Sequence, residues 1–320
     1  AAVTMEELAY ASDGLATIFD DHCLLPGVAF LHGTASVRER YLLPLMDGTK
    51  VACMAITEPE AGSDLSAETI HTRAVVDGDW FVVTGRKRFI TNAPVGDFAT
   101  TLCVMEGQLC MLVVDLKAPG VTVGPPDLKT GNRVQLTADV WFDEVRIPRT
   151  SILGAPGDGL RIALGALTWG RVAVGASGVG MAQAALDQCA HFMRQRRMFG
   201  TRLADMQYWQ FRLAERATQI GMARDLCYKA ALRYDSGVRM PEPETAMAKY
   251  YGTQVAGDVA RDAVQVFGGL GFITRLGADD ATCRVEQIYR DCKVAEIYEG
   301  ANEIQKRSIA RLALGRDWVK

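Results

Sequence analysis

Hydrophobic and polar positions divide the chain into three stretches with different periodicities. In residues 1–50, apolar side chains recur at helical spacing, as in Met5-Glu-Glu-Leu-Ala-Tyr and in Val37-Arg-Glu-Arg-Tyr-Leu-Leu. Pro44 and Gly48 follow the second of these segments and mark its end. We therefore expect residues 1–50 to form a helical domain.

Residues 51–154 show the alternation typical of strands. Two short apolar runs flank Asp77-Gly78, which is a strong hairpin signal. Residues 110–114 predict a further strand, and residues 135–142 alternate apolar and polar side chains along one more. Several short strands at this spacing favour a small β-barrel or β-sandwich.

Residues 155–320 return to helical periodicity. Apolar residues recur every three or four positions from Met206 to Ala230, which indicates one buried face of a long helix. Similar patterns predict helices over 160–194, 244–266 and 302–314. Long helices with short connections favour a four-helix bundle, so the expected fold class is α+β multidomain, with a helical, a β and a second helical domain.

Composition and charge narrow the class of protein. The chain has 320 residues, of which 49% are hydrophobic and 23% charged, as in a folded globular protein. Its net charge of -3 argues against nucleic acid as a partner, because phosphate binding requires a basic face. No apolar run approaches the length of a membrane span, and the first residues have neither a basic nor an apolar leader segment. We therefore expect no membrane association, no signal peptide and a cytoplasmic location.

The cysteines and histidines show no metal-binding or disulfide pattern. None of the eight cysteines forms a CxxC pair, and most lie within apolar or helical patterns. Four scattered histidines add no ligand spacing. We expect reduced, buried thiols and no metal site.

Two segments of the β region suit a bound cofactor. Residues 54–65 contain Thr, Pro, Gly, Ser and Asp after a short apolar run, and such a loop exposes N–H groups and hydroxyls to a phosphate or a polar ring edge. In residues 85–93, Phe89 offers a flat apolar face and Thr91 a hydrogen bond. The alternative interpretations are an ordinary turn and a surface strand.

Two segments of the helical region also carry candidate chemistry. Three arginines lie within residues 194–197, where they form either a solvated helix end or a pyrophosphate site. The glycines of 265–272 follow a helix and therefore do not form a Rossmann fingerprint. Glu299 precedes a helix that Asn302 could cap. It is either a solvated helix-start charge or, in an apolar pocket that raises its pKa, a general base.

Taken in order, these segments resemble the acyl-CoA dehydrogenase family. The matching signatures are Thr-Glu-Pro-x-Ala-Gly-Ser-Asp (57–64), Lys-x-Phe-Ile-Thr-Asn (87–92), Arg-x-x-Phe-Gly (196–200) with Gln207, Phe-Gly-Gly-x-Gly-Phe (267–272), and Arg-Asp-x-Lys followed by Tyr-Glu-Gly (290–300). They cover nearly the whole chain. The family's order of an α domain, a β domain and a four-helix bundle agrees with the division into 1–50, 51–154 and 155–320, although the first domain is shorter than in the family.

The resemblance implies FAD as cofactor and an acyl-CoA or acyl-carrier-protein substrate. It also implies an electron-transferring flavoprotein or similar acceptor, a homo-oligomer built as a dimer of dimers, and a role in fatty acid metabolism. The positions that match the family's cofactor contacts are Ile56, Thr57, Ser63, Phe89, Thr91, Arg196, Phe199, Gln207, Gln265, Gly269, Ala301 and Glu303. Those that match its substrate contacts are Ser63, Arg171, Tyr298 and Gly300.

The resemblance also assigns the catalytic base. Glu299 matches the base of the Tyr-Glu-Gly signature. Some family members instead place the base beside the arginine that matches Arg171, and that position is Gly170 in this chain. Only one of the two positions therefore carries a carboxylate. The implied reaction removes the α-proton of the thioester with Glu299 and the β-hydrogen as hydride to the flavin.

Three departures from the family pattern stand out. The N-terminal helices that help to close the acyl pocket are shortened. The hairpin around residues 104–109 is tighter than in the family. Ala301 and Met198 stand where the family commonly has polar residues. We expect each change to weaken one hydrogen bond to FAD, worth roughly 0.5–1.5 kcal/mol, without abolishing binding.

Two alternatives to a dehydrogenase stay open. One is a flavin oxidase or monooxygenase on the same fold, because fold does not determine function. The other is a non-catalytic subunit of a hetero-oligomeric dehydrogenase, although such a subunit would not need to keep both Glu299 and the cofactor positions.

Overall fold

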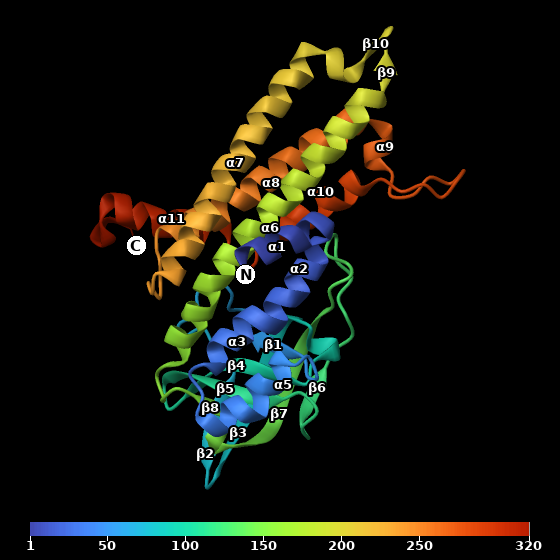
Figure 1. Ribbon diagram of the computed structural model, residues 1–320. Coiled ribbons are helices and arrows are strands. Elements are labelled where there is room, and N and C mark those ends of the chain that lie inside the picture. The colour runs from blue at the N-terminus through green and yellow to red at the C-terminus, as the bar shows by residue number, and fades with distance from the viewer. Residues whose placement is uncertain (320) are drawn as a thin grey trace. The chain divides into compact units, whose positions relative to one another are not determined.

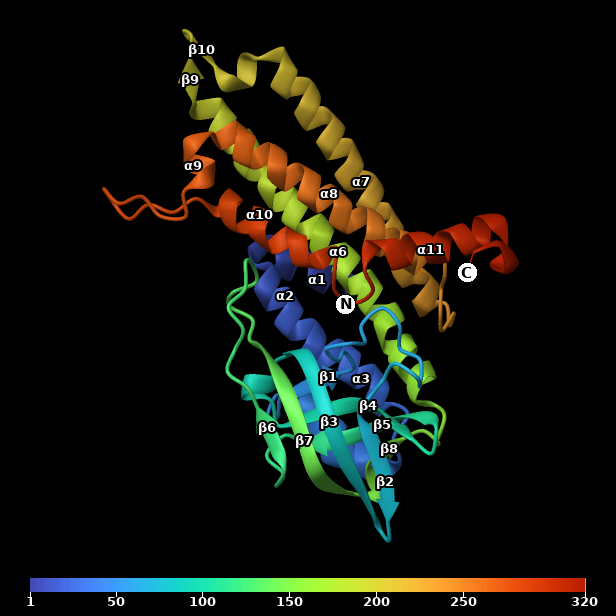
Figure 2. The same ribbon diagram turned by 180° about the vertical axis from the view of Figure 1, so that it is seen from behind.

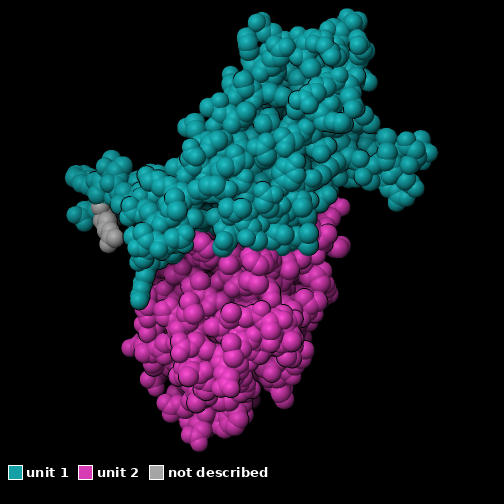
Figure 3. Space-filling view, viewed as in Figure 1, with its two compact units in different colours: residues 1–16, 129–132, 171–320 teal, residues 17–128, 133–170 magenta. Residues whose placement is uncertain are grey.

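A computed structural model describes residues 1–319 and groups them into two compact units (Figure 3). The helical unit comprises residues 1–16, 129–132 and 171–320, and the sheet unit comprises residues 17–128 and 133–170. The division into three domains at 50 and 154 stays a prediction. The expected α+β fold, with a sheet in the middle and helices after it, is confirmed.

The sheet unit contains one mixed sheet (Figures 1 and 2). Its strands are β1 (Ala52–Ala55), β2 (Arg73–Asp77), β3 (Trp80–Thr91), β4 (Phe98–Met105), β5 (Gln108–Asp115), β6 (Val121–Val123), β7 (Thr137–Pro148) and β8 (Ile152–Leu153). Their order is β6-β7-β3-β2-β4-β5-β8, with β1 beside β4. The predicted hairpin at Asp77-Gly78 is confirmed, because Asp77 pairs with Trp80 across the turn between β2 and β3.

Both faces of the central strands are buried, which explains why β4 is a continuous apolar run. One face packs against Phe81, Val83 and Phe142 from the strands β3 and β7. The other packs against the N-terminal helices, where the rings of Phe30 and Tyr41 meet Phe98 at centroid distances of 5.7 and 5.2 Å.

The N-terminal segment is helical, as predicted, but it contains two π-helical turns. Its elements are α1 (Ala2–Ala11), α2 (Asp13–Phe19), the π-helix Asp20–Leu24, α3 (Leu25–Phe30), α4 (Ala35–Val37), the π-helix Arg38–Leu42 and α5 (Leu43–Met46). Pro26 and Pro44 each lie just after a π-helical turn. Proline has no N–H and its ring clashes with the carbonyl four residues earlier, so the wider turn accommodates it.

The four long helices predicted after the sheet are present: α6 (Gly159–Gln195), α7 (Gln207–Asp235), α8 (Glu244–Phe267) and α11 (Asn302–Leu314). Residues 159–170 of α6 belong to the sheet unit and the rest of these helices to the helical unit. The helical unit also contains α9 (Gly269–Phe272), α10 (Arg284–Ala295) and the short strands β9 (Arg197–Met198) and β10 (Thr201–Arg202). Short 3-10 helices cover Ala93–Val95, Arg149–Ser151, Leu203–Asp205 and Arg316–Trp318. The sequence did not predict α10, which packs along α8. Within this unit α6 and α8 approach closely, because a Cβ on Gly178 would lie 2.6 Å from the Gly252 carbonyl oxygen.

One helix of the described residues meets the length and composition criteria of a membrane span, although it has no continuous apolar run of that length. By length and composition alone, α6 is apolar enough to cross a membrane, with a mean hydropathy of 1.3 over its most apolar window. Of that window, 78% is buried inside the protein, and the core helix of a soluble protein passes the same test. The apolar character of α6 is therefore explained by core packing.

The eight cysteines are all free thiols in this structure. All are buried except Cys23 and Cys283, which are partly exposed. Burial raises the pKa of the Cys227 thiol to about 12. Among residues 1–319, no group of three or more His, Cys, Asp or Glu side chains is placed to hold a metal ion.

Candidate active site

A buried ion pair fixes the Thr-Glu-Pro loop to the sheet. Lys87 on β3 is fully buried and donates to the Ile56 carbonyl at 3.0 Å and to Glu58 Oε1 at 2.8 Å. Glu58 also accepts from the backbone N–H groups of His71 and Thr72 at 2.6 and 2.9 Å. Burial by itself would raise the pKa of Glu58, but Lys87 and these donors lower it. The pair is therefore charged, and it holds the backbone of residues 56–58 in place.

This arrangement limits which atoms of Ile56 a cofactor can reach. Its side chain is buried in the core of the sheet unit, and its carbonyl accepts from Lys87. Ile56 can therefore offer a cofactor only its backbone N–H. Thr57 is half-buried and Ser63 is exposed, so both hydroxyls remain accessible.

A β-bulge turns Phe89 outward. Lys87 pairs with Val140 and Ile90 with Ala138, so β3 contains one residue more than β7 between these pairs. Phe89 lies in the bulge with a φ of 59° and is 63% exposed, while Thr91 beyond it is half-buried. The bulge thus presents an aromatic face and a hydroxyl at neighbouring positions, as predicted from the motif.

A second group of predicted residues lies at one end of the bundle. Figure 1 shows the β9–β10 hairpin and α9 at the same end of α6, α7 and α8, and the stacked rings of Phe192 and Phe267, 4.2 Å apart, join the ends of α6 and α8. The turn between β9 and β10 has positive φ at Phe199 and Gly200. Every predicted residue of this group is exposed: Arg196, Phe199, Gln207, Gln265 and Gly269.

The turn between α10 and α11 carries Glu299. Glu299 has a φ of 53° and Gly300 a φ of 90°. The buried side chain of Gln305 donates to the Gly300 carbonyl at 2.8 Å, and the Asn302 N–H donates to the Glu296 carbonyl at 3.0 Å. A Cβ at position 300 would lie 2.5 Å from Gln305 Nε2, which explains the glycine. Hydrogen bonds on both sides therefore hold Glu299 in a backbone conformation that costs about 1–2 kcal/mol.

The expected helix cap is different. Ala301, not Asn302, is the N-cap of α11 and makes no side-chain cap bond. Asn302 is instead the first helical residue, and its side chain bonds with Thr253 and Lys249 on α8. Glu303 is exposed and Tyr298 is half-buried.

Three observations in the helical unit bear on substrate binding. The Gly300 N–H has no hydrogen-bond partner within the described chain, so it is available to a carbonyl oxygen. One carboxylate oxygen of Glu299, Oε2, is buried. Arg171 is also buried, and its guanidinium pairs with Glu242, just before α8.

Further buried acids lie in the same unit. Asn132 donates from Nδ2 to Asp13 at 2.8 Å and from its backbone N–H to Asp291 at 2.6 Å. Burial raises the pKa of Asp13 to about 7, and the charges of Asp291 and Glu299 add to this effect. The sequence did not single out Asp13, because an acid early in a helix is usually solvated.

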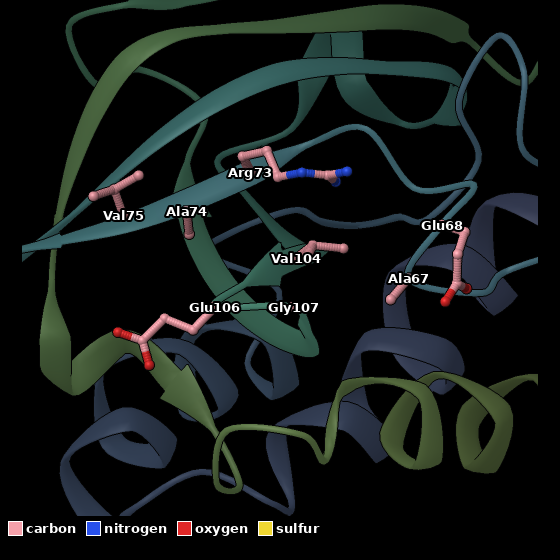
Figure 4. Close-up of a pocket in the computed structure, with 8 residues that line it drawn as sticks. All are labelled: Ala67, Glu68, Arg73, Ala74, Val75, Val104, Glu106 and Gly107. Carbon is pink, nitrogen blue, oxygen red and sulfur yellow. The ribbon is translucent and has the colours of Figure 1, made fainter.

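Two pockets lie away from most of the predicted residues. A pocket of about 430 Å³ in the sheet unit is lined by Ala67, Glu68, Arg73, Ala74, Val75, Val104, Glu106 and Gly107 (Figure 4). None of these residues was predicted, and the Arg73 guanidinium donates to the carbonyls of Ile70 and Thr72. A pocket of about 580 Å³ in the helical unit includes Glu242, the partner of Arg171.

Comparisons with known proteins match nearly the whole chain. Residues 53–145 match the acyl-CoA dehydrogenase middle domain and residues 157–314 its C-terminal domain. The chain is 37% identical to a 3-(aryl)acrylate reductase of Clostridium sporogenes over 96% of this chain and 80% of that protein. It is 35% identical to the caffeyl-CoA reductase-Etf complex subunit CarC of Acetobacterium woodii (98% and 81%) and 34% identical to the human mitochondrial short-chain specific acyl-CoA dehydrogenase (97% and 74%).

Comparison with solved structures points to the same family. Butyryl-CoA dehydrogenase from Megasphaera elsdenii superposes with a TM-score of 0.90 at 32% identity, covering 98% of this chain and 81% of that one. The chain belongs to the acyl-CoA dehydrogenase family. It is an FAD-dependent oxidoreductase that acts on CH–CH groups. A prolyl acyl carrier protein oxidase, AnaB, has the same fold with a TM-score of 0.91 at 26% identity, covering 98% of this chain and 82% of that one.

The residues of this acyl-CoA dehydrogenase fit a flavin. The exposed ring of Phe89 on a bulge and the fixed backbone at Thr57 suit an aromatic ring with a polar edge. The exposed arginine and glutamine side chains at the end of the bundle suit a pyrophosphate and an adenosine. Within the helical unit, however, this group and the Glu299 turn are separate, because α10 lies between them and its 12 residues span about 18 Å.

Sequence reasoning missed the residues that hold the site in place. Glu58, Lys87 and Lys249 are buried charges, and the first two lie inside recognised motifs without a role having been assigned to them. The only sequence signal for Lys249 is its place among the small residues of α8. This signal does not predict burial, because charged side chains are rarely buried fully.

Proposed function

We propose that this enzyme removes the α-proton of an acyl-CoA thioester with Glu299, so that the α,β-bond becomes a double bond. The observation that carries the proposal is the backbone of the turn. A non-glycine residue is held at positive φ by hydrogen bonds on both sides, and such strain is characteristic of functional sites.

Each group of the turn has a distinct part in this reaction. The Gly300 N–H donates to the thioester carbonyl oxygen and stabilises the negative charge that develops there. Glu299 accepts the α-proton, which this hydrogen bond makes more acidic. Gln305 holds the Gly300 carbonyl, so that the N–H and the carboxylate stay in register.

FAD, when bound, supplies the oxidising step by taking the β-hydrogen as hydride. Phe89 and Thr91 would contact its ring system, and Thr57 and Ser63 would donate to its polar groups. Arg196, Gln207 and Gln265 would hold its adenosine half. Their exposure supports an arrangement in which a second copy of the chain takes part.

The relatives support a short or compact acyl group. Their names refer to aryl acrylates, caffeyl-CoA and short-chain acyl-CoA, and we propose a substrate from this range. One of these relatives is named as a subunit of an Etf complex, which supports an electron-transferring flavoprotein as the redox partner.

One specific observation favours a second candidate. The similarity to a prolyl acyl carrier protein oxidase supports an oxidase that acts on a carrier-bound thioester. The two candidates differ in how fast the reduced flavin reacts with oxygen, and in whether free acyl-CoA reduces the flavin at all.

The test is anaerobic reduction of the purified holoenzyme by a panel of saturated short-chain and arylpropanoyl CoA thioesters. We expect one class to bleach the visible flavin bands in the wild type. Glu299→Gln should keep its FAD and lose bleaching by about a thousandfold or more, within the range for a general base. Glu215→Gln, an exposed carboxylate on α7, is the matched control and should behave as wild type.

Three outcomes would count against the proposal. Bleaching by Glu299→Gln at the wild-type rate would remove Glu299 from the reaction. Reduction only by acyl-carrier-protein thioesters, with rapid reoxidation by oxygen, would favour the oxidase. Failure of every thioester, with FAD bound, would favour a non-catalytic subunit.

A further inference from the structure

Lys249 is a fully buried cation beneath the Glu299 turn. It lies on α8, on a face of small residues that includes Ala248, Gly252 and Thr253, and none of its surface is exposed. Its ammonium donates to Asn302 Oδ1 at 3.0 Å. Within residues 1–319 it forms no ion pair, since no carboxylate oxygen lies within 4.0 Å of Nζ.

The hydrogen bond from Lys249 is accepted by Asn302, the residue at which the Glu299 turn ends. Asn302 is the first residue of α11, and its backbone N–H closes the turn onto the Glu296 carbonyl. Its side chain also bonds Thr253 Oγ1 at 3.0 Å, one turn of α8 beyond Lys249. Two side chains of α8 therefore hold the residue at which the turn ends.

The charge of Lys249 acts on the same turn through space. The pKa of Lys249 is lowered to about 8, mainly by burial and to a smaller extent by the charge of Arg171, while Glu299, then Glu296 and Glu303, oppose this effect. Attraction between two charges is mutual, so the ammonium favours the ionised carboxylate of Glu299. A carboxyl group acts as a base only in its ionised form, so this attraction favours the active form.

We propose that Lys249 is the positioning residue for the catalytic base: through Asn302 it holds the Glu299 turn, and its buried positive charge attracts the Glu299 carboxylate. This proposal rests on the proposed function of Glu299. Lys249 itself contacts neither the substrate nor the cofactor in this account.

Three variants separate the hydrogen bond from the charge. Lys249→Met removes both, Lys249→Gln retains a donor for Asn302 without the charge, and Lys249→Arg retains the charge. Replacing a buried charge by an apolar group of similar volume is often tolerated by the fold. FAD content and thermal unfolding of each holoenzyme check this, and Lys306→Met, an exposed lysine on α11, is the matched control.

The measurement is the pH profile of kcat and kcat/KM with the acyl-CoA that reduces the wild type fastest. Removing a neighbouring cation makes a carboxylate harder to ionise, so the acidic limb should move to higher pH by about one unit in Lys249→Met and Lys249→Gln. At the wild-type optimum kcat should fall about tenfold or more in Lys249→Met, with less loss in Lys249→Gln. KM should stay within about twofold, and Lys249→Arg should restore the acidic limb.

Two results would overturn the proposal. If Lys249→Met has the wild-type kcat and acidic limb while Glu299→Gln is inactive, Lys249 has no positioning role although the proposed function stands. If Glu299→Gln is itself fully active, the proposed function fails and the role of Lys249 fails with it.

Discussion

Two regions of this acyl-CoA dehydrogenase place a residue at positive φ beside a buried lysine, but the lysine has a different partner in each region. Each presents a non-glycine residue at positive φ, Phe89 on β3 and Glu299 after α10, and each has a fully buried lysine beside it. Lys87 pairs with the carboxylate of Glu58 at 2.8 Å, whereas the Lys249 ammonium, among residues 1–319, bonds only with the amide oxygen of Asn302.

The difference teaches what a buried charge can do. The carboxylate of Glu58 neutralises the charge of Lys87. The ion pair therefore fixes the Thr-Glu-Pro loop, and its electrostatic effect on more distant groups is small. The amide of Asn302 carries no net charge. The charge of Lys249 is therefore not neutralised, and it acts on nearby carboxylates. The sheet region is therefore built for rigidity and the Glu299 region for electrostatic control.

The largest expected effect comes from breaking the paired region. Glu58→Ala leaves the Lys87 ammonium buried without its carboxylate, which should lower the free energy of unfolding by about 3–5 kcal/mol. Urea unfolding followed by circular dichroism measures this. Glu60→Ala, an exposed acid on the same loop, should change it by less than about 0.5 kcal/mol. A loss from Glu58→Ala as small as that of the control would show that the pair does not hold the loop.

The second largest expected effect concerns Asp13, which lies in the helical unit with Glu299, and it is a pH-dependent change in the free energy of unfolding. Asp13 has a pKa of about 7 in the folded protein and an ordinary value near 3.8 when unfolded. The folded state binds this proton more tightly, so the contribution to stability is complete below about pH 4 and is lost as pH rises towards 7. Asp13→Asn, whose amide oxygen can still accept from Asn132, removes that loss.

We therefore expect Asp13→Asn to exceed the wild type in unfolding free energy by about 2–4 kcal/mol at pH 8 and to match it near pH 4. Urea unfolding at both pH values measures the difference. Asp225→Asn, an exposed acid on α7, is the control. A gain of equal size at both pH values would contradict the assignment, because it would not involve a proton.

The smallest effect concerns the strained backbone at Phe89. Phe89→Ala keeps a side chain at a φ of 59°, whereas Phe89→Gly relieves it, so the glycine variant should be more stable by about 1 kcal/mol. Both variants lose the ring, so both should bind FAD about tenfold more weakly. Thermal unfolding of the apoprotein and titration with FAD measure the two quantities. If FAD affinity is unchanged in both, the ring of Phe89 does not contact the flavin.

Much of the fold follows from local sequence patterns. The hairpin at Asp77-Gly78 and the helices α6, α7, α8 and α11 were predicted because periodicity and turn residues act over short distances. The helix α10 was missed, since its residues were interpreted only as motif positions. The membrane-like length of α6 was also missed, because its small residues are apolar without forming one continuous run.

The sequence predicted which types of residue the candidate site contains, but not how they are arranged in space. Glu299 and Phe89 could be named from their motifs, but their positive φ depends on hydrogen bonds and strand pairing from distant segments. The roles of Lys249 and Asn302 depend on a contact between residues 53 positions apart. Sequence patterns favoured Asn302 as a helix cap, and the tertiary contact with α8 overrides that preference.

The central claim is that Glu299 removes the α-proton, and proton exchange tests it without the redox step. Acetyl-CoA has α-protons and no β-carbon, so it can lose a proton to the base but cannot transfer a hydride. Incubation of the holoenzyme with acetyl-CoA in D₂O, followed by proton NMR of its methyl group, measures abstraction alone. We predict exchange by the wild type and by Glu215→Gln, and none above background by Glu299→Gln. Exchange by Glu299→Gln at the wild-type rate would contradict it.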